Sequence, residues 1–418
     1  MTPLAGLLQS YLDLRWHFDP AAASAAAVVS ADSKLGAFDA QAMREHLVAF
    51  RSVAGAIEDL ELDELDDEID RTALLADVRV TIARFEQERP HVRDPGFWIT
   101  HAHEAVASLL AGPSADERAP AAFARISLLP GFLDAARTTI RRPPVLLVDA
   151  ALAQLGPVGE LLVRAASRFG PAAPGGAEAM NAAVTTALQA FARFGTALRD
   201  EIEPEGDWAR AALGGELFER RVQEAYAVRS SPTELARWAA ETLAGPAATD
   251  SAPPGAPTVT GHQLAEAQER AIPGLASAVR RAIRSPVAVE GWALYASGVN
   301  AETDPRWLGR LRNAAARLAV DVGLHARGMA PAEAVRLLTS EAEMTPDAAE
   351  REIRRIAAAP TSGLAAAAGY REILRLRQAY GASEAGPVRD AFHAALLQYG
   401  ALPPGLAGWG MGLAASSM

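Results

Sequence analysis

Apolar residues recur at intervals of three and four along most of the chain, whereas strand-like alternation is nearly absent. Examples of this spacing are the segments 104–112 (EAVASLLAG), 233–245 (TELARWAAETLAG) and 331–343 (PAEAVRLLTSEAE). Because an α-helix has about 3.6 residues per turn, this spacing gathers the apolar side chains on one face of each segment. The sequence therefore predicts an all-α fold with few or no strands.

Several helix boundaries are marked by capping residues. The segment 231–234 (SPTE) has a capping serine, a first-turn proline and a glutamate that can reach back to the cap. The segment 345–347 (TPD) repeats the cap and the proline. Gly245 and Gly328 follow helical patterns, and we expect each of them to end a helix.

The length of 418 residues is compatible with two or three domains, although helical proteins of this size are often one body. The segment 245–261 (GPAATDSAPPGAPTVTG) is rich in proline, glycine and alanine, which predicts a loop that is either a lid or a linker. We expect an N-terminal helical region at 1–244 and a C-terminal helical region at 262–418, joined as one continuous structural unit. A shorter loop is expected at 169–180.

Charge and composition exclude several classes of protein. The net charge of -11 argues against a nucleic-acid binder and against adhesion to an anionic membrane. The chain has no cysteine, so any metal would be held by histidine, carboxylates or water. The first 20 residues lack a signal-peptide pattern, and no run approaches the length of an apolar membrane span. We therefore expect a soluble, cytoplasmic protein with no membrane and no nucleic-acid partner.

A histidine and two glutamates could form a metal site. His262 and Glu266 are four residues apart, so on a helix they share a face, and Glu290 could supply a third ligand. The simpler interpretation is a histidine near a helix start and a glutamate on the surface. Glu290 could likewise be a first-turn carboxylate that the helix dipole favours, since Pro286 indicates a helix start. Spacing alone leaves both interpretations open.

A second candidate is the pair formed by Asp321 and His325, which are also four residues apart. The spacing permits an Asp–His pair on one helix face. It is also typical of a histidine that caps carbonyl groups at a helix end, here near Gly328. The sequence contains no glycine-rich phosphate loop, nucleophile elbow or dinucleotide fingerprint.

Five segments in a fixed order resemble a known bacterial family, the domain of unknown function 885. They are 261–268 (GHQLAEAQ), 289–299 (VEGWALYASGV), 317–329 (RLAVDVGLHARGM), 352–377 (EIRRIAAAPTSGLAAAAGYREILRLR) and 392–400 (FHAALLQYG). That family looks like a helical zinc metallopeptidase of the gluzincin type. The resemblance implies an elongated helical body with a central cleft.

The zinc motif of the resembled family is incomplete in this chain. In our alignment His262 matches one histidine ligand and Glu290 matches the third ligand. Ala256 falls where the first histidine is expected, and Pro257 falls where the catalytic glutamate is expected. Alanine and proline can neither hold zinc nor deprotonate a bound water. The resemblance thus implies a metal site that has lost part of its ligands.

Changes further along the chain agree with this interpretation. Arg355 is retained, but Ile356 replaces the tyrosine that follows it in the family pattern. The segment 361–363 (TSG) replaces Gly-Gln-Ala, and alanines at Ala366 and Ala394 replace a tyrosine and an aspartate. Small or inert side chains therefore stand where the pattern has hydrogen-bonding groups.

Three hypotheses for the function follow. The first is a zinc-free descendant that uses the inherited cleft for a small-molecule or peptide-like ligand, or for a non-peptidase biosynthetic step. Its candidate catalytic residues are Glu290, His262, His325 and Tyr295, and its candidate substrate-binding residues are Arg355, Tyr370 and Trp292. A glutamate and a histidine facing one apolar cavity could serve as an acid–base pair.

The second hypothesis is a zinc-dependent hydrolase with an atypical site. Its metal ligands would be His262, Glu290 and Glu266, completed by water. The third hypothesis is a non-catalytic interaction protein in which small side chains close the former cleft. Of the three, we expect the first, with no bound cofactor, and zinc is the alternative.

Overall fold

The computed structural model describes residues 2–112, 115–206, 208–245, 259–301, 303–381 and 387–413. These residues are mainly helical and form no sheet, which confirms the predicted all-α fold. Two isolated bridges pair Pro144 with Glu205 and Arg284 with Ala401. The predicted loop at 245–261 lies mostly outside the described residues. The division of the chain into an N-terminal region at 1–244 and a C-terminal region at 262–418 therefore stays a prediction.

The chain divides into two compact units that each combine segments distant in the sequence. Unit 1 comprises Met1–Leu8, Ala56–Val80 and Ala212–Met418, and unit 2 comprises Gln9–Gly55 and Thr81–Ala211. The helices α1 (Pro3–Phe18), α3 (Ala40–Glu58) and α4 (Leu65–Ala83) contribute residues to both units.

Unit 2 contains most of α1 and α3 together with a series of consecutive helices. The remaining helices of this unit are α2 (Pro20–Ala25), η1 (Val29–Ala31), η2 (Arg84–Glu88), α5 (Pro90–Arg93), α6 (Pro95–Leu110), α7 (Ala115–Thr139), α8 (Val145–Phe169), η3 (Gly170–Ala172), α9 (Gly176–Asp200) and η4 (Trp208–Ala211). The loop expected at 169–180 is shorter than predicted, because η3 and the start of α9 occupy much of that segment.

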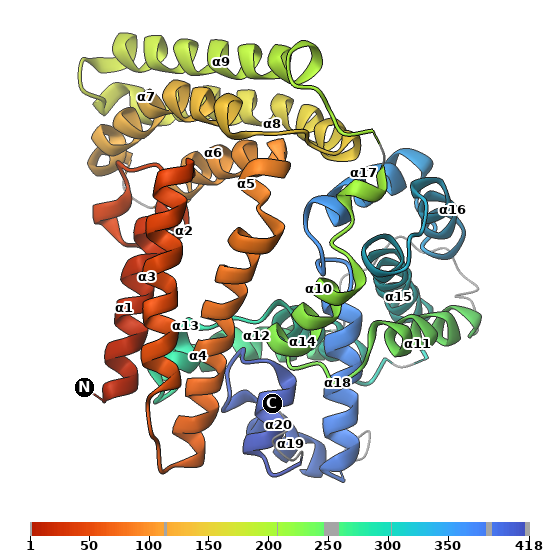
Figure 1. Ribbon diagram of the computed structural model, residues 1–418. Helices are drawn as coiled ribbons and strands as arrows, with labels where there is room; N and C mark the ends of the chain where they lie inside the picture. Colours follow the sequence, from red (N-terminus) through yellow and green to blue (C-terminus); the bar gives the residue numbers. More distant parts are fainter. Residues whose placement is uncertain are drawn as a thin grey trace. The chain divides into compact units, whose positions relative to one another are not determined.

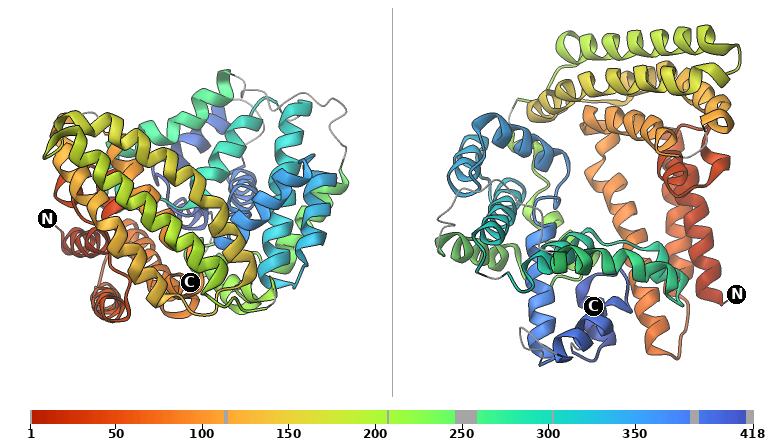
Figure 2. Two further views of the ribbon diagram at one scale, coloured as in Figure 1. Left: turned by 90° about the horizontal axis from the view of Figure 1, so that it is seen from above. Right: turned by 180° about the vertical axis from the view of Figure 1, so that it is seen from behind.

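Long helices and an aromatic cluster form the core of unit 2. The helices α7, α8 and α9 lie side by side and contact one another, as all three views show (Figures 1 and 2). Phe38 makes edge-to-face contacts with Phe18, Phe97 and Trp98 at centroid distances of 5.2, 4.9 and 5.7 Å. Such contacts add to the free energy gained from burying the rings.

One described segment of unit 2, Val145–Ala172, is long and apolar enough to cross a membrane by length and composition alone. This differs from the expectation that no run approaches such a length. The segment contains α8, which packs against α6, α7 and α9, so part of its apolar surface is covered by neighbouring helices.

Unit 1 contains the C-terminal half of the chain, which carries the candidate site. Its helices, besides those shared with unit 2, are α10 (Gly215–Arg220), η5 (Arg221–Ala225), α11 (Pro232–Ala244), α12 (Val259–Ala271), η6 (Ile272–Gly274), α13 (Ala278–Ala282), α14 (Pro286–Gly298), α15 (Pro305–Ala326), α16 (Pro331–Glu341), α17 (Pro346–Ala358), α18 (Ala365–Ala379), α19 (Pro387–Leu397) and α20 (Pro404–Gly410).

The predicted helix boundaries of unit 1 are confirmed where capping signals are present. The side chain of Ser231 accepts from the Glu234 amide while the Glu234 carboxylate accepts from the Ser231 amide, which completes a capping box. Thr345 caps α17 by accepting from the Ala348 amide. Gly328 follows α15 with φ of +69°, a left-handed conformation that glycine adopts without a steric penalty.

Within unit 1, α14 packs closely on α18 and also contacts α12, while α15 contacts α11, α16, α17 and α18. The contacts of α15 with α14 and α17 bring together the helices on which Glu290, His325 and Arg355 lie.

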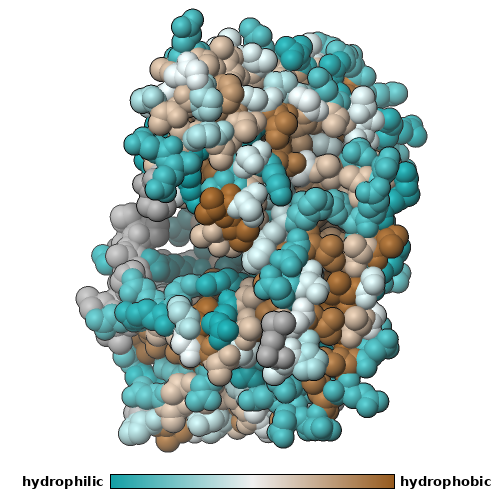
Figure 3. All heavy atoms as spheres, turned by 90° about the vertical axis from the view of Figure 1, so that its left-hand side faces the viewer, coloured by the Kyte–Doolittle hydropathy of each residue, from teal (hydrophilic) through white to brown (hydrophobic). Residues whose placement is uncertain are grey.

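On the face of the molecule shown in Figure 3, hydrophilic side chains are interspersed with apolar areas.

Candidate functional site

Glu290 lies on α14 directly before a very close helix crossing. A Cβ atom on Gly291 would lie 2.4 Å from the Cα of Gly369 on α18, and a Cβ on Gly369 would lie 1.9 Å from the carbonyl oxygen of Val287. Only glycine fits at both positions, because real Cβ atoms do not approach other atoms this closely. The glycine after Glu290 therefore fixes the distance between α14 and α18.

The Glu290 side chain is accessible to solvent, and no described residue forms a hydrogen bond or ion pair with it. Desolvation by the surrounding protein nevertheless raises the pKa of its carboxyl group, and the positive charges of Arg355 and Arg317 oppose this shift. Glu290 is therefore an accessible carboxyl group near two guanidinium groups that it does not contact directly.

These two arginines share a different carboxylate, that of Glu352. The Nε of Arg317 lies 2.8 Å from Oε1 of Glu352, and Nη2 of Arg355 lies 2.7 Å from the same oxygen. A second bond joins Nε of Arg355 to Oε2 at 3.0 Å. Burial is the largest single influence on the pKa of Glu352 and acts to raise it. The hydrogen bonds and positive charges of Arg355 and Arg317 together outweigh burial and hold this pKa below its usual range.

This arrangement orients Arg355 and leaves part of its guanidinium group available. Its Nε and Nη2 are bonded to Glu352, whereas no described residue accepts from Nη1. The side chain of Arg355 is 47% exposed. Glu352 and Arg317 are not among the residues predicted from the sequence, although Glu352 lies three residues before Arg355 on α17 and this i, i+3 spacing could have indicated the pair.

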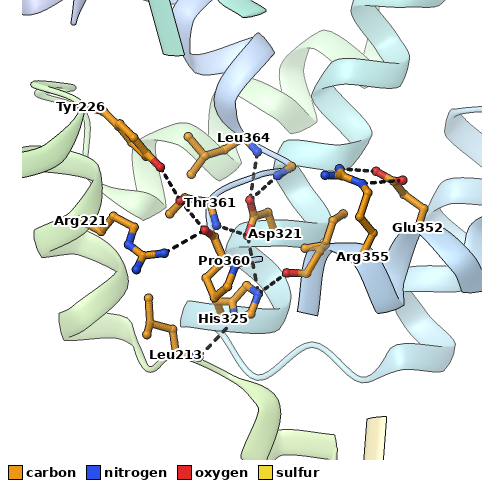
Figure 4. Close-up of polar contacts among 12 residues, drawn as sticks. Leu213, Arg221, Tyr226, Asp321, His325, Glu352, Arg355, Pro360, Thr361 and Leu364 are labelled. Atoms are coloured by element: carbon orange, nitrogen blue, oxygen red, sulfur yellow. Dashed lines mark hydrogen bonds and ion pairs between the residues drawn. The ribbon is translucent and has the colours of Figure 1, made fainter. Parts of the chain in front are cut away.

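Asp321 on α15 holds the loop between α17 and α18 (Figure 4). Its Oδ1 accepts from the Thr361 amide at 3.1 Å, and its Oδ2 accepts from the Gly363 and Leu364 amides at 2.7 and 3.0 Å. Asp321 is completely buried, and burial raises its pKa to about 7 while the three amide donors act in the opposite direction. Asp321 thus connects α15 to the start of α18.

The loop held by Asp321 contains a strained residue. Thr361 has φ of +73°, in the left-handed region that β-branched residues rarely adopt. Its hydroxyl group lies 2.8 Å from the phenol oxygen of Tyr226, and Arg221 donates to the carbonyl of Pro360 at 3.1 Å (Figure 4). Several independent contacts therefore hold the backbone in this conformation.

His325 uses both ring nitrogens to hold backbone segments. Its Nδ1 accepts from the Leu213 amide at 3.2 Å, and its Nε2 lies 3.0 Å from the carbonyl oxygen of Ile356 (Figure 4). With its proton on Nε2, the neutral ring donates to the Ile356 carbonyl and leaves Nδ1 free to accept from the Leu213 amide. Burial lowers the pKa of His325 to about 4, so the ring is neutral near pH 7. The predicted catalytic role of His325 stays a prediction, and this geometry makes it a link between three segments.

Trp292, Tyr295 and His393 form a buried cluster between α14 and α19. The Trp292 Nε1 donates to the carbonyl of Leu264 on α12 at 2.9 Å. The Tyr295 hydroxyl lies 2.8 Å from Nε2 of His393, whose pKa burial lowers to about 4. Trp292 and Tyr295 are 1% and 2% exposed, so both belong to the core as the structure places them. Their predicted roles in binding and catalysis stay predictions.

Tyr370, the other predicted substrate-binding residue, is buried on α18 at the position after Gly369. It is 8% exposed, and its ring lies edge-on to that of Trp307 with a centroid distance of 6.0 Å. Of the predicted substrate-binding residues, Arg355 is therefore the accessible one.

The predicted metal ligands lie on α12 and α14, which contact each other. Glu266 is exposed and forms an ion pair of 3.5 Å with Arg270. The side chain of His262 lies outside the described side chains, although its backbone belongs to α12. Among the side chains that the structure describes, no group of three or more His, Asp or Glu could hold a metal ion. The site formed by His262, Glu266 and Glu290 stays a prediction.

Comparisons with known proteins agree with the helical fold. The family model described as "Bacterial protein of unknown function (DUF885)" matches residues 20–248 and 258–407. A solved structure described as "a putative lipoprotein of unknown function from Shewanella oneidensis" has a TM-score of 0.75 and 16% identity, and covers 98% of this chain and 100% of its own.

A second solved structure, "the putative lipoprotein from Colwellia psychrerythraea", has a TM-score of 0.72 and 12% identity, with 99% of this chain and 100% of its own covered. No curated protein matches the chain. At these identities the similarity to the solved structures establishes the fold alone.

Proposed function

The chain belongs to the bacterial family of unknown function DUF885, and we propose that its unit 1 binds a small peptide-like ligand, without catalytic zinc, through Glu290 and Arg355. The ligand carries a carboxylate and an amine. The observation that carries this proposal is the accessible, unpartnered carboxyl group of Glu290 near a guanidinium group with a free edge.

The chemistry of the two groups defines the ligand class. A guanidinium group binds a carboxylate through parallel N–H donors, and Arg355 is already oriented by Glu352. A glutamate carboxylate accepts from an ammonium group. Desolvation strengthens both interactions, since the effective dielectric constant near the protein is lower than in water. A molecule with both charges would complement the pair.

The neighbouring groups support binding more than acid–base catalysis. Asp321 and His325 are engaged with the backbone, and Tyr295 is buried against His393. We therefore assign Glu290 and Arg355 as ligand-binding residues. The hydrolase alternative requires zinc held by Glu290, His262 and Glu266, and the experiment below separates the two.

Titration calorimetry with dipeptides and their end-blocked forms tests the proposal. We expect N-acetylation and C-terminal amidation each to weaken binding about tenfold or more, because each removes one charge-assisted hydrogen bond. Glu290→Gln should remove the preference for a free amine, and Arg355→Gln should remove the preference for a free carboxylate.

The control is Arg354→Gln, which makes the same charge change on the neighbouring residue of α17. Arg354 pairs with Glu350 at 3.0 Å, and its replacement should leave the affinity within about twofold. Absence of binding, or equal loss in the Arg354→Gln variant, would contradict the proposal. Near-stoichiometric zinc that disappears in the Glu290→Gln variant would favour the hydrolase instead.

A further inference from the structure

A cavity of about 710 Å³ lies within unit 2, formed by the start of α3, the segment from η2 to α5, and the end of α7 with the residues after it. All of its lining residues belong to this unit, and none of them belongs to the candidate site of unit 1. The volume falls in the range of small-molecule sites, roughly 300–1,000 Å³.

Three arginines from three different segments line this cavity: Arg44 on α3, Arg89 between η2 and α5, and Arg141 after α7. All three are accessible to solvent. Within the described part of the chain, none of them forms an ion pair with a carboxylate. Arg141 donates from Nη1 to the carbonyl of the preceding residue, at 2.8 Å. The cavity therefore carries three guanidinium groups that pair with no described carboxylate.

The two carboxylates that line the same cavity are already engaged. Asp39 caps α3, where its Oδ1 accepts from the Gln41 and Ala42 amides at 2.9 and 3.1 Å. Glu86 forms an ion pair with Arg51, which does not line the cavity. Neither carboxylate pairs with one of the three arginines, and three guanidinium charges against two carboxylate charges leave the lining with a net positive charge, which favours an anion.

His91 adds an unsatisfied polar group to the lining. The residue is 5% exposed, and its buried Nδ1 has no hydrogen-bond partner among the described residues. The backbone of His91 is held by Trp98, which donates from Nε1 to the His91 carbonyl at 2.9 Å. Buried polar atoms without a partner are uncommon in folded proteins, and a group bound in the cavity would account for this one.

The backbone at Arg89 is strained. Arg89 has φ of +52° and ψ of +54°, a left-handed conformation that costs an ordinary residue free energy and that glycine would adopt more readily. Such strain concentrates at functional sites. Here it occurs at one of the three cavity-lining guanidinium groups.

The remaining walls are apolar. Met43, Leu47 and Phe85 line the cavity beside the charged groups. We propose that this cavity binds an amphiphilic organic anion, whose carboxylate or phosphate head is held by Arg44, Arg89 and Arg141 and whose apolar body packs against Met43, Leu47 and Phe85. This site is separate from the one assigned to Glu290 and Arg355.

Titration calorimetry of the full chain tests this site with octanoate and octyl phosphate. We expect at least one of them to bind about tenfold or more tightly than octyl glucoside, which has a neutral head, and than acetate or inorganic phosphate, which lack the apolar body. The tighter of the two anions identifies the head group. Equal binding of octyl glucoside, or no binding of either anion, would overturn the proposal.

Matched variants locate the binding. Arg44→Gln and Arg141→Gln should each weaken the anion about tenfold or more, because each removes a charge-assisted donor. Arg137→Gln is the control, since Arg137 lies on α7 near the cavity but pairs with Glu201 at 2.6 Å. The affinity of the Arg137→Gln variant for the anion should stay within about twofold of the wild-type value. A loss of affinity in this control as large as that in the Arg44→Gln and Arg141→Gln variants would contradict the assignment.

Two further variants separate binding from folding and from the other site. Arg89→Gly removes a guanidinium group and relieves the strained backbone, so it should weaken the anion without lowering the melting temperature. Glu290→Gln should leave anion affinity unchanged. Unchanged anion affinity in the Arg89→Gly variant, or a parallel loss in the Glu290→Gln variant, would exclude a separate site in unit 2.

Discussion

The amide of Thr361 donates to Oδ1 of Asp321 at 3.1 Å while Thr361 itself holds a φ of +73°. A completely buried carboxylate on α15 thus holds a β-branched residue in a conformation that such residues avoid. The same carboxylate accepts from the Gly363 and Leu364 amides, so it organises the loop that leads into α18. Unit 1 therefore depends on a polar contact in its interior.

Replacing Asp321 with asparagine should lower the free energy of unfolding by about 2–4 kcal/mol. An amide has one acceptor oxygen, so its NH2 group would take the place of either Oδ1 or Oδ2 and would leave at least one of the three backbone donors unsatisfied. Urea denaturation measures the change.

The matched control makes the same substitution at Asp304, which caps the same helix by accepting from the Arg306 amide at 2.8 Å. Asparagine caps helices as well as aspartate does, so Asp304→Asn should change stability by less than about 0.5 kcal/mol. Equal effects at the two positions would refute the special role of Asp321.

Thr361→Gly should be more stable than Thr361→Ala by about 1 kcal/mol. Both variants lose the hydroxyl contact with Tyr226, but only glycine relieves the positive φ. The comparison isolates backbone strain from the lost hydrogen bond. Thermal and urea unfolding of the two variants measure it, and a more stable alanine variant would mean that the backbone at this position is unstrained.

Gly291→Ala should destabilise the protein by about 1–3 kcal/mol, because the new Cβ would overlap Gly369 and force α14 away from α18. Gly309→Ala is the control within α15, where a Cβ meets no atom within 4 Å. That substitution should stabilise by roughly 0.5–1 kcal/mol through helix propensity. The two changes in the free energy of unfolding should therefore differ in sign.

The stabilising contribution of His325 should decrease as the pH falls. Its pKa in the folded protein is about 4, below the unfolded value of about 6.5, so the unfolded chain binds more protons in this interval. This contribution is complete above about pH 6.5 and is lost progressively towards pH 4, by up to about 3 kcal/mol.

The difference in unfolding free energy between the wild type and His325→Gln isolates this group, since other titrating groups cancel. Urea unfolding at a series of pH values should give a difference that shrinks from pH 6.5 to 4. A difference that stays constant over this range would show that the ring titrates normally in the folded protein.

The sequence predicted the features that depend on local patterns. The helical fold, the caps at Ser231 and Thr345 and the helix end near Gly328 were all predicted and are confirmed. Each of these follows from residues within a few positions of one another, where spacing and side-chain chemistry act directly.

Features that depend on distant segments were not predicted. The contact of Tyr295 with His393 joins residues 98 positions apart, and no local spacing indicates it. The cavity in unit 2 combines Arg44, Arg89 and Arg141 from three segments that carry no motif. Glu352 could have been found from its spacing to Arg355, but its sharing with Arg317 depends on the packing of α15 against α17.

The most direct test of the central claim is the affinity of wild-type protein for a free dipeptide, measured by calorimetry before and after treatment with EDTA. Our account predicts that Kd stays within about twofold, because Glu290 and Arg355 contact the ligand themselves. Loss of binding after chelation, restored by added zinc, would show that Glu290 serves a metal and would contradict the account.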